Sequence, residues 1–467
     1  MFRLFYQPSG TWFGDCMPFY ENGQFHLFHQ RDTRNPGVFG EPFGWSLART
    51  SNFIDYEDLG EVIPGGGDDA QDQFIYAGSV FRGADAYYAF YTGYNRTFAD
   101  QGRPAQALMI ATSTDLLHWT KTDRAVVLPE PGYDPNHWRD PFLFFDRGRQ
   151  RYVLILGARK IQGQKVLTGR TVYFTSPDLQ EWEFRGDFWA PDLYTMHEMP
   201  DLFQLGDYWY LLTTDYNDAC KTVYRMSRSL EGPWAAPPDD AFDGRAYYAA
   251  RSAADGEHRY LFGWVPTKEN DDDTGAWQWG GTLLVHELVQ RADGTLGVAL
   301  PGTVRAALIN STPLQEGPIQ LSRADGLAET VLSPQLEPEV SVTATIRFSA
   351  GTRKISLRLR ENPETGEGYQ FSLHPSCHQV RFDRHGTFRW SGYNDKGLQR
   401  FVHLEPDTDH RLQLICDGTI ATLYVDDVAL SARMYTDGGA ALAVDVVDGA
   451  VEIRDAVVSQ VAPRNQE

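Results

Sequence analysis

The sequence has few cysteines and no segment of the kind that crosses a membrane. Only four of its 467 residues are Cys, with no Cys-x-x-Cys pair and no His spacing suited to zinc. No apolar run approaches the length of a transmembrane helix, and the segment Met1–Tyr6 lacks the apolar core of a signal peptide. We therefore expect a soluble, cytoplasmic protein without a bound metal or another cofactor.

Positive charge is also scarce. The chain carries 42 Lys and Arg against 63 Asp and Glu, a formal net charge of −21, and it has no Lys/Arg run. Such a field repels nucleic acid and anionic membranes, which we exclude as partners. Gly65-Gly66-Gly67 neither follows a clear strand nor opens a helix, and no Gly-x-Ser-x-Gly elbow occurs. An uncharged carbohydrate is the small-molecule partner that remains compatible with these absences.

Aromatic residues and glycines are plentiful, and long amphipathic helical patterns are missing. Aromatics make up 13% of the chain, and there are 43 glycines, a composition that fits many short strands joined by turns. One pattern recurs as Ser113-Thr114-Asp115-Leu116-Leu117-His118-Trp119 and as Ser176-Pro177-Asp178-Leu179-Gln180-Glu181-Trp182, with weaker copies near Ser51 and Ser227. We interpret it as a turn in which Ser and Asp bind their own backbone, followed by an aromatic that packs between sheets.

A predicted β-hairpin precedes each copy, and a fifth hairpin follows the last. Five hairpins, each extended by further strands, predict an N-terminal five-bladed β-propeller built from four-stranded sheets. The hairpins lie at 17–29, 79–91, 141–156, 202–213 and 249–264.

The pattern changes after about residue 300. The repeat ends, prolines at 301, 313 and 318 mark a connection, and cleanly alternating segments follow, such as 340–348 and 355–360. Many short strands at regular spacing predict an antiparallel β-sandwich. The fold class is therefore all-β, with a propeller over 1–303, a linker over 304–318 and a β-sandwich over 319–467.

Three acids stand just before the first strands of predicted hairpins. The pattern predicts equivalent positions in different blades for Asp15, Asp140 and Glu198. Because the first strand of each blade lines the central channel, we expect them to converge at one mouth of it, beside Trp12, Trp138 and Arg139. Most acids at strand starts are solvated turn residues, but three in register beside aromatics are typical of a site that cleaves glycosidic bonds.

Short boxes around these acids resemble glycoside hydrolase family 32, the β-fructofuranosidases, invertases, levanases and inulinases. Arg139-Asp140-Pro141 is similar to that family's Arg-Asp-Pro box, and Glu198-Met199-Pro200-Asp201-Leu202-Phe203 to its Glu-Cys-Pro-Asp-Leu-Phe box. Supporting similarities run in the same order from Tyr76-Ala77-Gly78-Ser79 to Trp279-Gly280-Gly281 and into the C-terminal region.

The resemblance implies a role for each residue. Asp15 would be the nucleophile and Glu198 the acid/base of a retaining hydrolase acting on fructofuranosides. Asp140 would bind fructosyl hydroxyls and stabilise the transition state. The residues that would line the substrate site are Trp12, Gln30, Ser79, Arg139 and Trp264, with Asp218 and Lys221 near the leaving group; an ordinary surface ion pair is the alternative for the last two.

Three departures from the family pattern concern the substrate site. Gly14 stands where the family has an Asn beside the nucleophile, which removes an amide and should leave space. Met199 replaces the Cys after the acid/base, and His286-Glu287 replaces a frequent Pro-Arg. We interpret Cys16 as a buried structural thiol and the sandwich as a brace for the propeller.

Other functions remain compatible with the same residues. Fructosyl transfer, including intramolecular transfer to a difructose dianhydride, uses the same covalent intermediate. An inverting furanosidase of the related five-bladed class would use Asp15 to activate water. A carbohydrate-binding propeller without catalysis is a third alternative, although it would not need all three acids.

Overall fold

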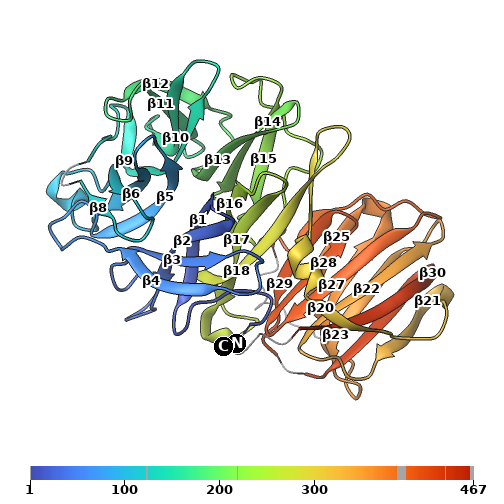
Figure 1. Cartoon of the computed structure of the whole chain (residues 1–467). Helices are drawn as coiled ribbons and strands as arrows, with labels where there is room; N and C mark the ends of the chain where they lie inside the picture. The colour runs from blue at the N-terminus through green and yellow to red at the C-terminus, as the bar shows by residue number, and fades with distance from the viewer. Residues whose placement is uncertain (1, 123–124, 218, 387–395, 437, 463–467) are drawn as a thin grey trace.

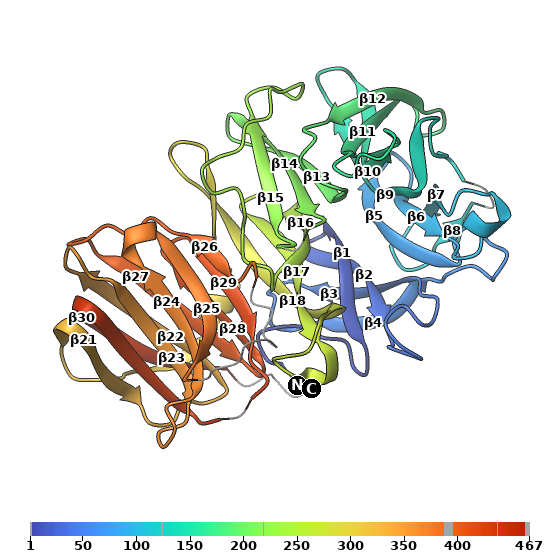
Figure 2. The same ribbon diagram turned by 180° about the vertical axis from the view of Figure 1, so that it is seen from behind.

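The computed structural model describes residues 2–122, 125–217, 219–386, 396–436 and 438–462 (Figure 1). It has two β-rich parts side by side, a ring of sheets formed by the N-terminal two thirds and a sandwich formed by the remainder (Figures 1 and 2). In the described ranges, no helix is both long and apolar enough to span a bilayer. The cytoplasmic location stays a prediction.

The ring consists of five antiparallel blades, which confirms the predicted propeller. Within each blade, consecutive strands pair in chain order. Blade four has three named strands, extended by isolated bridges at Ala235 and Ala241. The blades are β1 (Trp12–Glu21), β2 (Gln24–Asp32), β3 (Trp45–Thr50) and β4 (Glu57–Ile63); β5 (Phe74–Arg82), β6 (Tyr87–Tyr94), β7 (Gln106–Ser113) and β8 (Thr120–Lys121); β9 (Tyr133–Asp146), β10 (Arg151–Lys160), β11 (Gly169–Ser176) and β12 (Glu183–Trp189); β13 (His197–Leu205), β14 (Tyr208–Asp215) and β15 (Thr222–Ser227); β16 (Tyr248–Ala254), β17 (Arg259–Lys268), β18 (Trp277–Gln290) and β19 (Leu296–Ala299).

The ring closes through a direct pairing of its first and last blades. Phe13 of β1 pairs with Gly281 of β18, so that blades one and five form one continuous sheet. The first strands β1, β5, β9, β13 and β16 contact one another around the centre. Residues at corresponding points of these five strands therefore meet at the axis.

Local sequence explains the blade turns. Asn22 and Gly23, at φ 51° and 80°, form the two-residue turn between β1 and β2, because both positions of such a turn need positive φ. In the repeated motif, Ser113 Oγ accepts the Leu116 amide at 2.9 Å and Asp115 Oδ1 accepts the His118 amide at 2.8 Å. Ser176 and Asp178 make the same kinds of bonds in blade three.

The aromatic residue of the motif packs between blades, as predicted. Trp119 of blade two, directly before β8, meets Phe28 of blade one edge-to-face with ring centroids 5.6 Å apart. Trp182 of blade three meets Phe90 of blade two in the same way at 5.5 Å. Each motif therefore connects its own blade to the preceding one through an aromatic pair.

The C-terminal part is the predicted antiparallel sandwich, organised around its last strand. The 21-residue β30 pairs with four other strands, β20 to β23, and Val340–Phe348 and the other alternating segments are strands as expected. The strands are β20 (Leu308–Pro313), β21 (Ile319–Ser333), β22 (Glu339–Phe348), β23 (Lys354–Glu361), β24 (Gly368–His374), β25 (Gln379–His385), β26 (Gln399–Phe401), β27 (His410–Asp417), β28 (Ile420–Val425), β29 (Val428–Arg433) and β30 (Ala441–Val461), and the short helices of the chain are η1 (Ala99–Gln101), η2 (Glu269–Asp271), α1 (Gly302–Ala306) and η3 (Pro375–Cys377).

The predicted linker over 304–318 is wrong in part. Within that range α1 ends and β20 pairs with β30, for example Leu308 with Val461. The prolines suggested an open connection, but Pro313 lies at the last position of a strand that pairs only with β30, where a missing N–H is tolerated.

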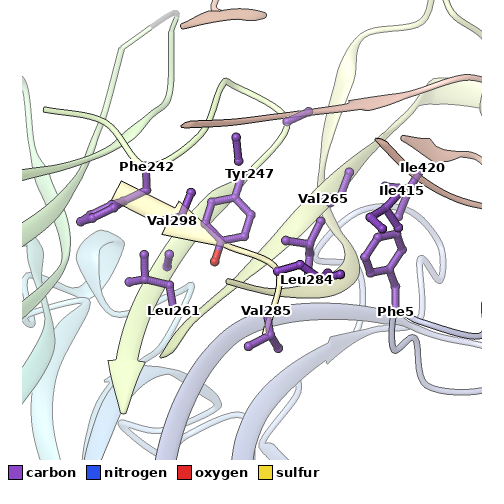
Figure 3. Close-up of a cluster of buried hydrophobic side chains, with 14 of the residues drawn as sticks. Phe5, Phe242, Tyr247, Leu261, Val265, Leu284, Val285, Val298, Ile415 and Ile420 are labelled. Atoms are coloured by element: carbon purple, nitrogen blue, oxygen red, sulfur yellow. The ribbon is translucent and has the colours of Figure 1, made fainter. Parts of the chain in front are cut away.

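The two parts share one continuous hydrophobic core. Buried residues of blade five and of the sandwich belong to the same cluster. Figure 3 shows Val265 and Leu284 of blade five next to Phe5, with Ile415 and Ile420 of the sandwich close by. Buried polar contacts cross the same boundary, such as Arg433 Nη2 of β29 donating to Val265 O of β17 at 2.9 Å.

Candidate active site

Four of the five inner strands have the same irregularity at the same place. In each, two residues stand opposite one residue of the neighbouring strand, the pattern of a β-bulge. Bulges redirect side chains that would otherwise alternate regularly across the sheet. Residues 14–15 stand opposite Gln30, residues 140–141 opposite Leu156, residues 199–200 opposite Thr213, and residues 249–250 opposite Gly263.

The three acids occupy three successive positions of this bulge. Glu198 directly precedes the bulge of its strand, Asp140 is the first bulge residue and Asp15 the second. The prediction that they hold equivalent positions is therefore wrong, although the prediction that they converge is confirmed by a shared pocket. Counting from the hairpin turn does not detect a bulge, so sequence alone placed them in register.

The shared pocket has a volume of about 670 Å³, which is within the range of small-molecule sites. Its lining combines the three acids with amides, cations and many aromatic rings. The residues that line it include Asp15, Gln30, Phe39, Tyr76, Tyr94, Arg96, His137, Arg139, Asp140, Glu198, Met199, Cys220, Arg245, Tyr248, Ala249, Trp264, Trp277 and Trp279.

Both carboxylate oxygens of Glu198 accept hydrogen bonds. Arg139 Nη2 donates to Oε1 at 2.6 Å, and the Tyr248 hydroxyl donates to Oε2. The carbonyl of Glu198 accepts from Thr213 Oγ1, the residue opposite the bulge, at 3.0 Å. Burial, and then the nearby Glu198 carboxylate, raises the pKa of Tyr248 well above its usual value, so this phenol remains a donor.

Among the residues that the structure describes, Asp15 has one close donor and two acidic neighbours. Trp264 Nε1 donates to Asp15 Oδ1 at 3.1 Å. Burial, followed by the charges of Asp140 and Glu198, raises the pKa of Asp15 to about 8, and Trp264 and Arg251 only partly oppose this shift. A carboxylate with so few donors is poorly solvated and correspondingly basic.

Asp140 is held by contacts to the blades on both sides of its own. It has φ 63°, its amide donates to Thr92 Oγ1 at 2.9 Å, and its Oδ2 accepts the Met199 amide at 3.0 Å. Arg139 Nε lies 3.8 Å from the same oxygen. Burial raises the pKa of Asp140 in spite of Arg139. The three acids therefore have three different environments in one pocket.

The other predicted site residues divide into two groups. Gln30, Arg139 and Trp264 line the pocket. Trp12 is not a lining residue; its ring lies under the Arg34 guanidinium, 4.6 Å from the ring centroid. Ser79 is buried, and its Oγ accepts the Leu143 amide at 3.1 Å.

Three further residues lie elsewhere than expected or cannot be placed. Lys221 Nζ donates to Gln399 O of the sandwich at 2.5 Å and does not line the pocket. Trp138 is buried in the core around blade three. Asp218 lies outside the described residues. The predicted contact of Lys221 with a leaving group is not supported by its position, because this cation is used at the boundary between the propeller and the sandwich.

The space expected beside Gly14 is filled. A Cβ atom on Gly14 would lie 2.2 Å from Cη2 and 2.7 Å from Cζ2 of Trp279. Trp279 packs face-to-face on Phe43 and edge-to-face on Trp264. The missing amide is thus replaced by an aromatic wall, not by a vacancy. Cys16, next to Asp15, is buried as predicted.

Sequence reasoning missed Tyr248 and Trp279. The signal for Tyr248 was available: aligning Ala249-Ala250 with Met199-Pro200 assigns Tyr248 to the position of Glu198 in the bulge. The contact of Trp279 with Gly14 joins two residues that are far apart in the chain, and no local pattern reports such a contact.

One group of described residues could hold a metal ion, and it is in the sandwich. Ligand atoms of His378, His403 and Glu405 lie within 4.8 Å of one another. However, the Leu404 amide donates to Nδ1 of His378, which leaves the imidazole proton on Nε2 in the neutral ring. Because a ligating nitrogen must be free of its proton, His378 is a poor ligand in this arrangement.

Comparisons with known proteins point to one family. The family model described as glycosyl hydrolases family 32 N-terminal domain matches residues 5–296. A sucrose-6-phosphate hydrolase of Staphylococcus xylosus is 26% identical over 297 residues, covering 59% of this chain and 57% of that protein. A probable sucrose-6-phosphate hydrolase of Psychromonas ingrahamii is 28% identical over 442 residues, covering 90% and 74%.

Solved structures agree on the fold. The structure of sucrose-6-phosphate hydrolase from Lactobacillus gasseri superimposes with a TM-score of 0.79 at 19% identity, covering 99% of this chain and 93% of that one. At such low identity the likeness concerns the fold. The chain spans little more than half the length of the Staphylococcus relative.

Proposed function

The chain belongs to glycosyl hydrolase family 32, and on this basis we propose that it is a retaining glycosidase that hydrolyses fructofuranosyl linkages of sucrose-type fructosides or fructans. One observation carries the proposal: Asp15, Asp140 and Glu198 line one pocket, each with a different set of donors. Carboxylates in different environments can divide the tasks of nucleophile, acid and hydroxyl binder.

In the proposed mechanism Asp15 attacks the anomeric carbon and Glu198 protonates the leaving oxygen. Glu198 then activates the water that releases the fructosyl unit from Asp15. Asp140 accepts hydrogen bonds from ring hydroxyls, which strengthen as positive charge develops on the sugar. The single donor on Asp15 supports its role, because a weakly solvated carboxylate is a better nucleophile.

Glu198 must gain a proton before it can act as an acid. Both of its oxygens accept hydrogen bonds, from Arg139 and from Tyr248, an arrangement that suits the carboxylate formed after the leaving group has been protonated. The Arg139 guanidinium can only donate hydrogen bonds, whereas the Tyr248 hydroxyl can rotate and become an acceptor. A proton on Oε2, donated toward Tyr248 or toward a substrate oxygen, is therefore the arrangement we propose for the acid form.

The lining of the pocket supports a sugar ligand. Gln30 is 1% exposed and its Nε2 donates to Ile75 O, while its Oε1 has no partner among the described residues. That acceptor suits a sugar hydroxyl, since a buried amide oxygen without a partner is costly. Arg96 and Arg245 also line the pocket, so we propose sucrose and its 6-phosphate, the substrate in the relatives' names, as the first compounds to test.

A panel of substrates tests the proposal. Purified protein is incubated with sucrose, sucrose 6-phosphate, 1-kestose, inulin and levan, and released fructose is measured. Glu198→Gln is the matched control, because it keeps the shape of the side chain and removes the acid. Fructose released by the wild type alone is the expected result, and new oligosaccharides would identify fructosyl transfer. No reaction with any member of the panel would contradict the proposed substrate class.

The anomeric configuration of the product tests the mechanism. A retaining pair of carboxyl groups lies roughly 5–5.5 Å apart, and an inverting pair about 6.5–9.5 Å apart. NMR of the first-formed fructose, recorded before mutarotation, should show β-fructofuranose from a β-fructofuranoside. If the α anomer is formed first, Asp15 activates water and is not the nucleophile.

A further inference from the structure

Arg251 is a buried cation at the centre of the propeller. It lies on β16, its residue is 1% exposed, and it does not line the pocket. It directly follows the two bulge residues of blade five, and Cys16, Phe142 and Asp201 hold the same position in three other blades. These residues form the layer next to the acids along the inner strands.

The guanidinium of Arg251 connects three blades. Its Nη2 donates to Asp140 O at 2.7 Å, and its Nη1 donates to Pro141 O at 3.2 Å and to Gly78 O. Asp140 and Pro141 are the bulge residues of β9, whose carbonyls have left the regular strand ladder. Arg251 therefore supplies the donors that the bulge lacks, and it does so from a strand on another blade.

Arg251 is also the cation that opposes the unfavourable charges around Asp15. The ionisable groups facing Asp15 are Asp140 on β9, Glu198 on β13, and Arg251 and Tyr248 on β16, with Cys16 next to it on β1. The other central guanidinium, Arg139, is engaged with Glu198 at 2.6 Å. Of these groups, Arg251 is the cation whose charge lowers the pKa of Asp15.

We propose that Arg251 is a positioning residue for the reaction: it fixes the Asp140-Pro141 bulge from outside the pocket, and its charge favours the carboxylate form of Asp15, which is the form that attacks. This inference rests on the proposed function. It requires no contact between Arg251 and substrate, so its effect should fall on turnover and on the pH dependence and not on substrate binding.

Two variants separate the charge from the shape. Arg251→Gln removes the charge and keeps one donor, whereas Arg251→Lys keeps the charge and loses the forked geometry. Arg251→Met, which fills a similar volume, replaces the Gln variant if that does not fold. Folding is checked by circular dichroism and a melting curve before kinetics are measured.

With sucrose as substrate, the neutral variants should lose kcat roughly 100-fold at pH 6 with KM within about 2-fold of wild type. In the pH profile of kcat/KM, the acidic limb of these variants should move to higher pH by about one unit, because the loss of an opposite charge raises the pKa of the Asp15 carboxyl. Arg251→Lys should lower kcat without moving that limb.

A direct titration makes the result independent of turnover. Protein labelled with ¹³C at the Asp carboxyls is titrated by NMR, and the Asp15 signal is assigned from the Asp15→Asn variant. The pKa of Asp15 should rise in the neutral variants and stay unchanged in Arg251→Lys. An unchanged Asp15 titration in the neutral variants would overturn the proposal. Failure of the wild type to cleave any fructoside would instead overturn the proposed function, because the titration would still report the effect of Arg251.

Discussion

At the residue scale, the site places like charges together at a cost to the fold. Asp15, Asp140 and Glu198 line one pocket, and the first two have raised pKa values, mainly through burial. A carboxyl whose pKa is higher in the folded protein than in the unfolded chain contributes less to stability as the pH rises. Grouping such acids in one pocket lowers the stability of the folded protein, a common consequence of arranging charged groups for activity.

We expect Asp15→Asn to be inactive and more thermostable than wild type. Between the unfolded value near 3.8 and the folded value of about 8, wild-type stability falls with rising pH, because this carboxyl ionises in the unfolded chain while the folded protein keeps it protonated. Asparagine avoids that penalty, so Tm at pH 8 should rise by about 2–4 °C. At pH 4, where Asp15 is protonated, the difference should be much smaller.

Melting curves of both proteins from pH 4 to 8 provide the measurement. Asp207→Asn, with a side chain 86% exposed, is the control and should behave like wild type. An Asp15→Asn variant that melts below wild type at pH 8 would contradict the predicted strain at Asp15.

The fit between Gly14 and Trp279 leads to a second prediction at this scale. Gly14→Asn should lower kcat/KM about 100-fold and Tm by several degrees, because its Cβ would overlap the Trp279 ring. Combining it with Trp279→Ala should recover part of both losses, since the two residues share one space. Kinetics and melting curves of the two single variants and the double variant test this. Losses that simply add would show that the two positions act independently.

At the element scale, the bulge of the inner strands decides where the functional side chains point. It recurs in four blades, and its first residue has positive φ in three of them: Asp140, Met199 and Ala249 at 63°, 51° and 56°. Positive φ is unfavourable for residues with a Cβ and worst for β-branched ones. The strain is therefore located beside the pocket, where the surrounding sheet holds it.

Ala249 allows this conformation to be tested without altering an acid. Ala249→Val should reduce activity at least 10-fold and cost about 2–4 kcal/mol, because a buried β-branched residue resists φ 56°. Ala249→Gly should retain activity. Urea unfolding and kinetics of both variants are the measurements, and a Val variant equal to wild type would show that the bulge is easily rearranged.

At the scale of the whole molecule, the sandwich is built into the propeller through buried polar contacts. Asp243, 2% exposed, accepts from His286 Nε2 of β18 at 3.1 Å and from Ser431 Oγ of β29 at 2.6 Å. His286 Nδ1 bonds the Tyr424 hydroxyl of β28 at 2.8 Å. Burial alone would raise the pKa of Asp243, but hydrogen bonds from His286 and Ser431 hold it below its usual value. These contacts support the bracing role predicted for the sandwich.

Asp243→Ala should therefore destabilise the whole protein by about 3–5 kcal/mol, since it leaves buried donors of both parts without an acceptor. Calorimetry should show a lower melting temperature, with separate transitions if the two parts uncouple. Asp207→Ala on the exposed surface is the control. A variant that melts within 1 °C of wild type would mean that apolar packing alone joins the two parts.

The sequence by itself determined the blades, the sandwich and which three acids meet in one pocket. These features depend on local patterns: the alternation of apolar and polar residues with a period of two, Asn-Gly turns, the Ser-x-Asp-Leu-x-x-Trp motif, and short boxes such as Arg139-Asp140-Pro141. Local patterns are read correctly because neighbouring residues supply most of the hydrogen bonds that they predict, as Ser113 and Asp115 do.

Only the tertiary structure decided how those residues meet. The bulge shifts Glu198, Asp140 and Asp15 to three different positions, Trp279 fills the space beside Gly14, and Lys221 binds the sandwich at Gln399 instead of facing the pocket. Each of these outcomes depends on strand register or on contacts between residues far apart in the chain. The energies that set them come from packing and burial in the folded protein, which no single segment of the sequence contains.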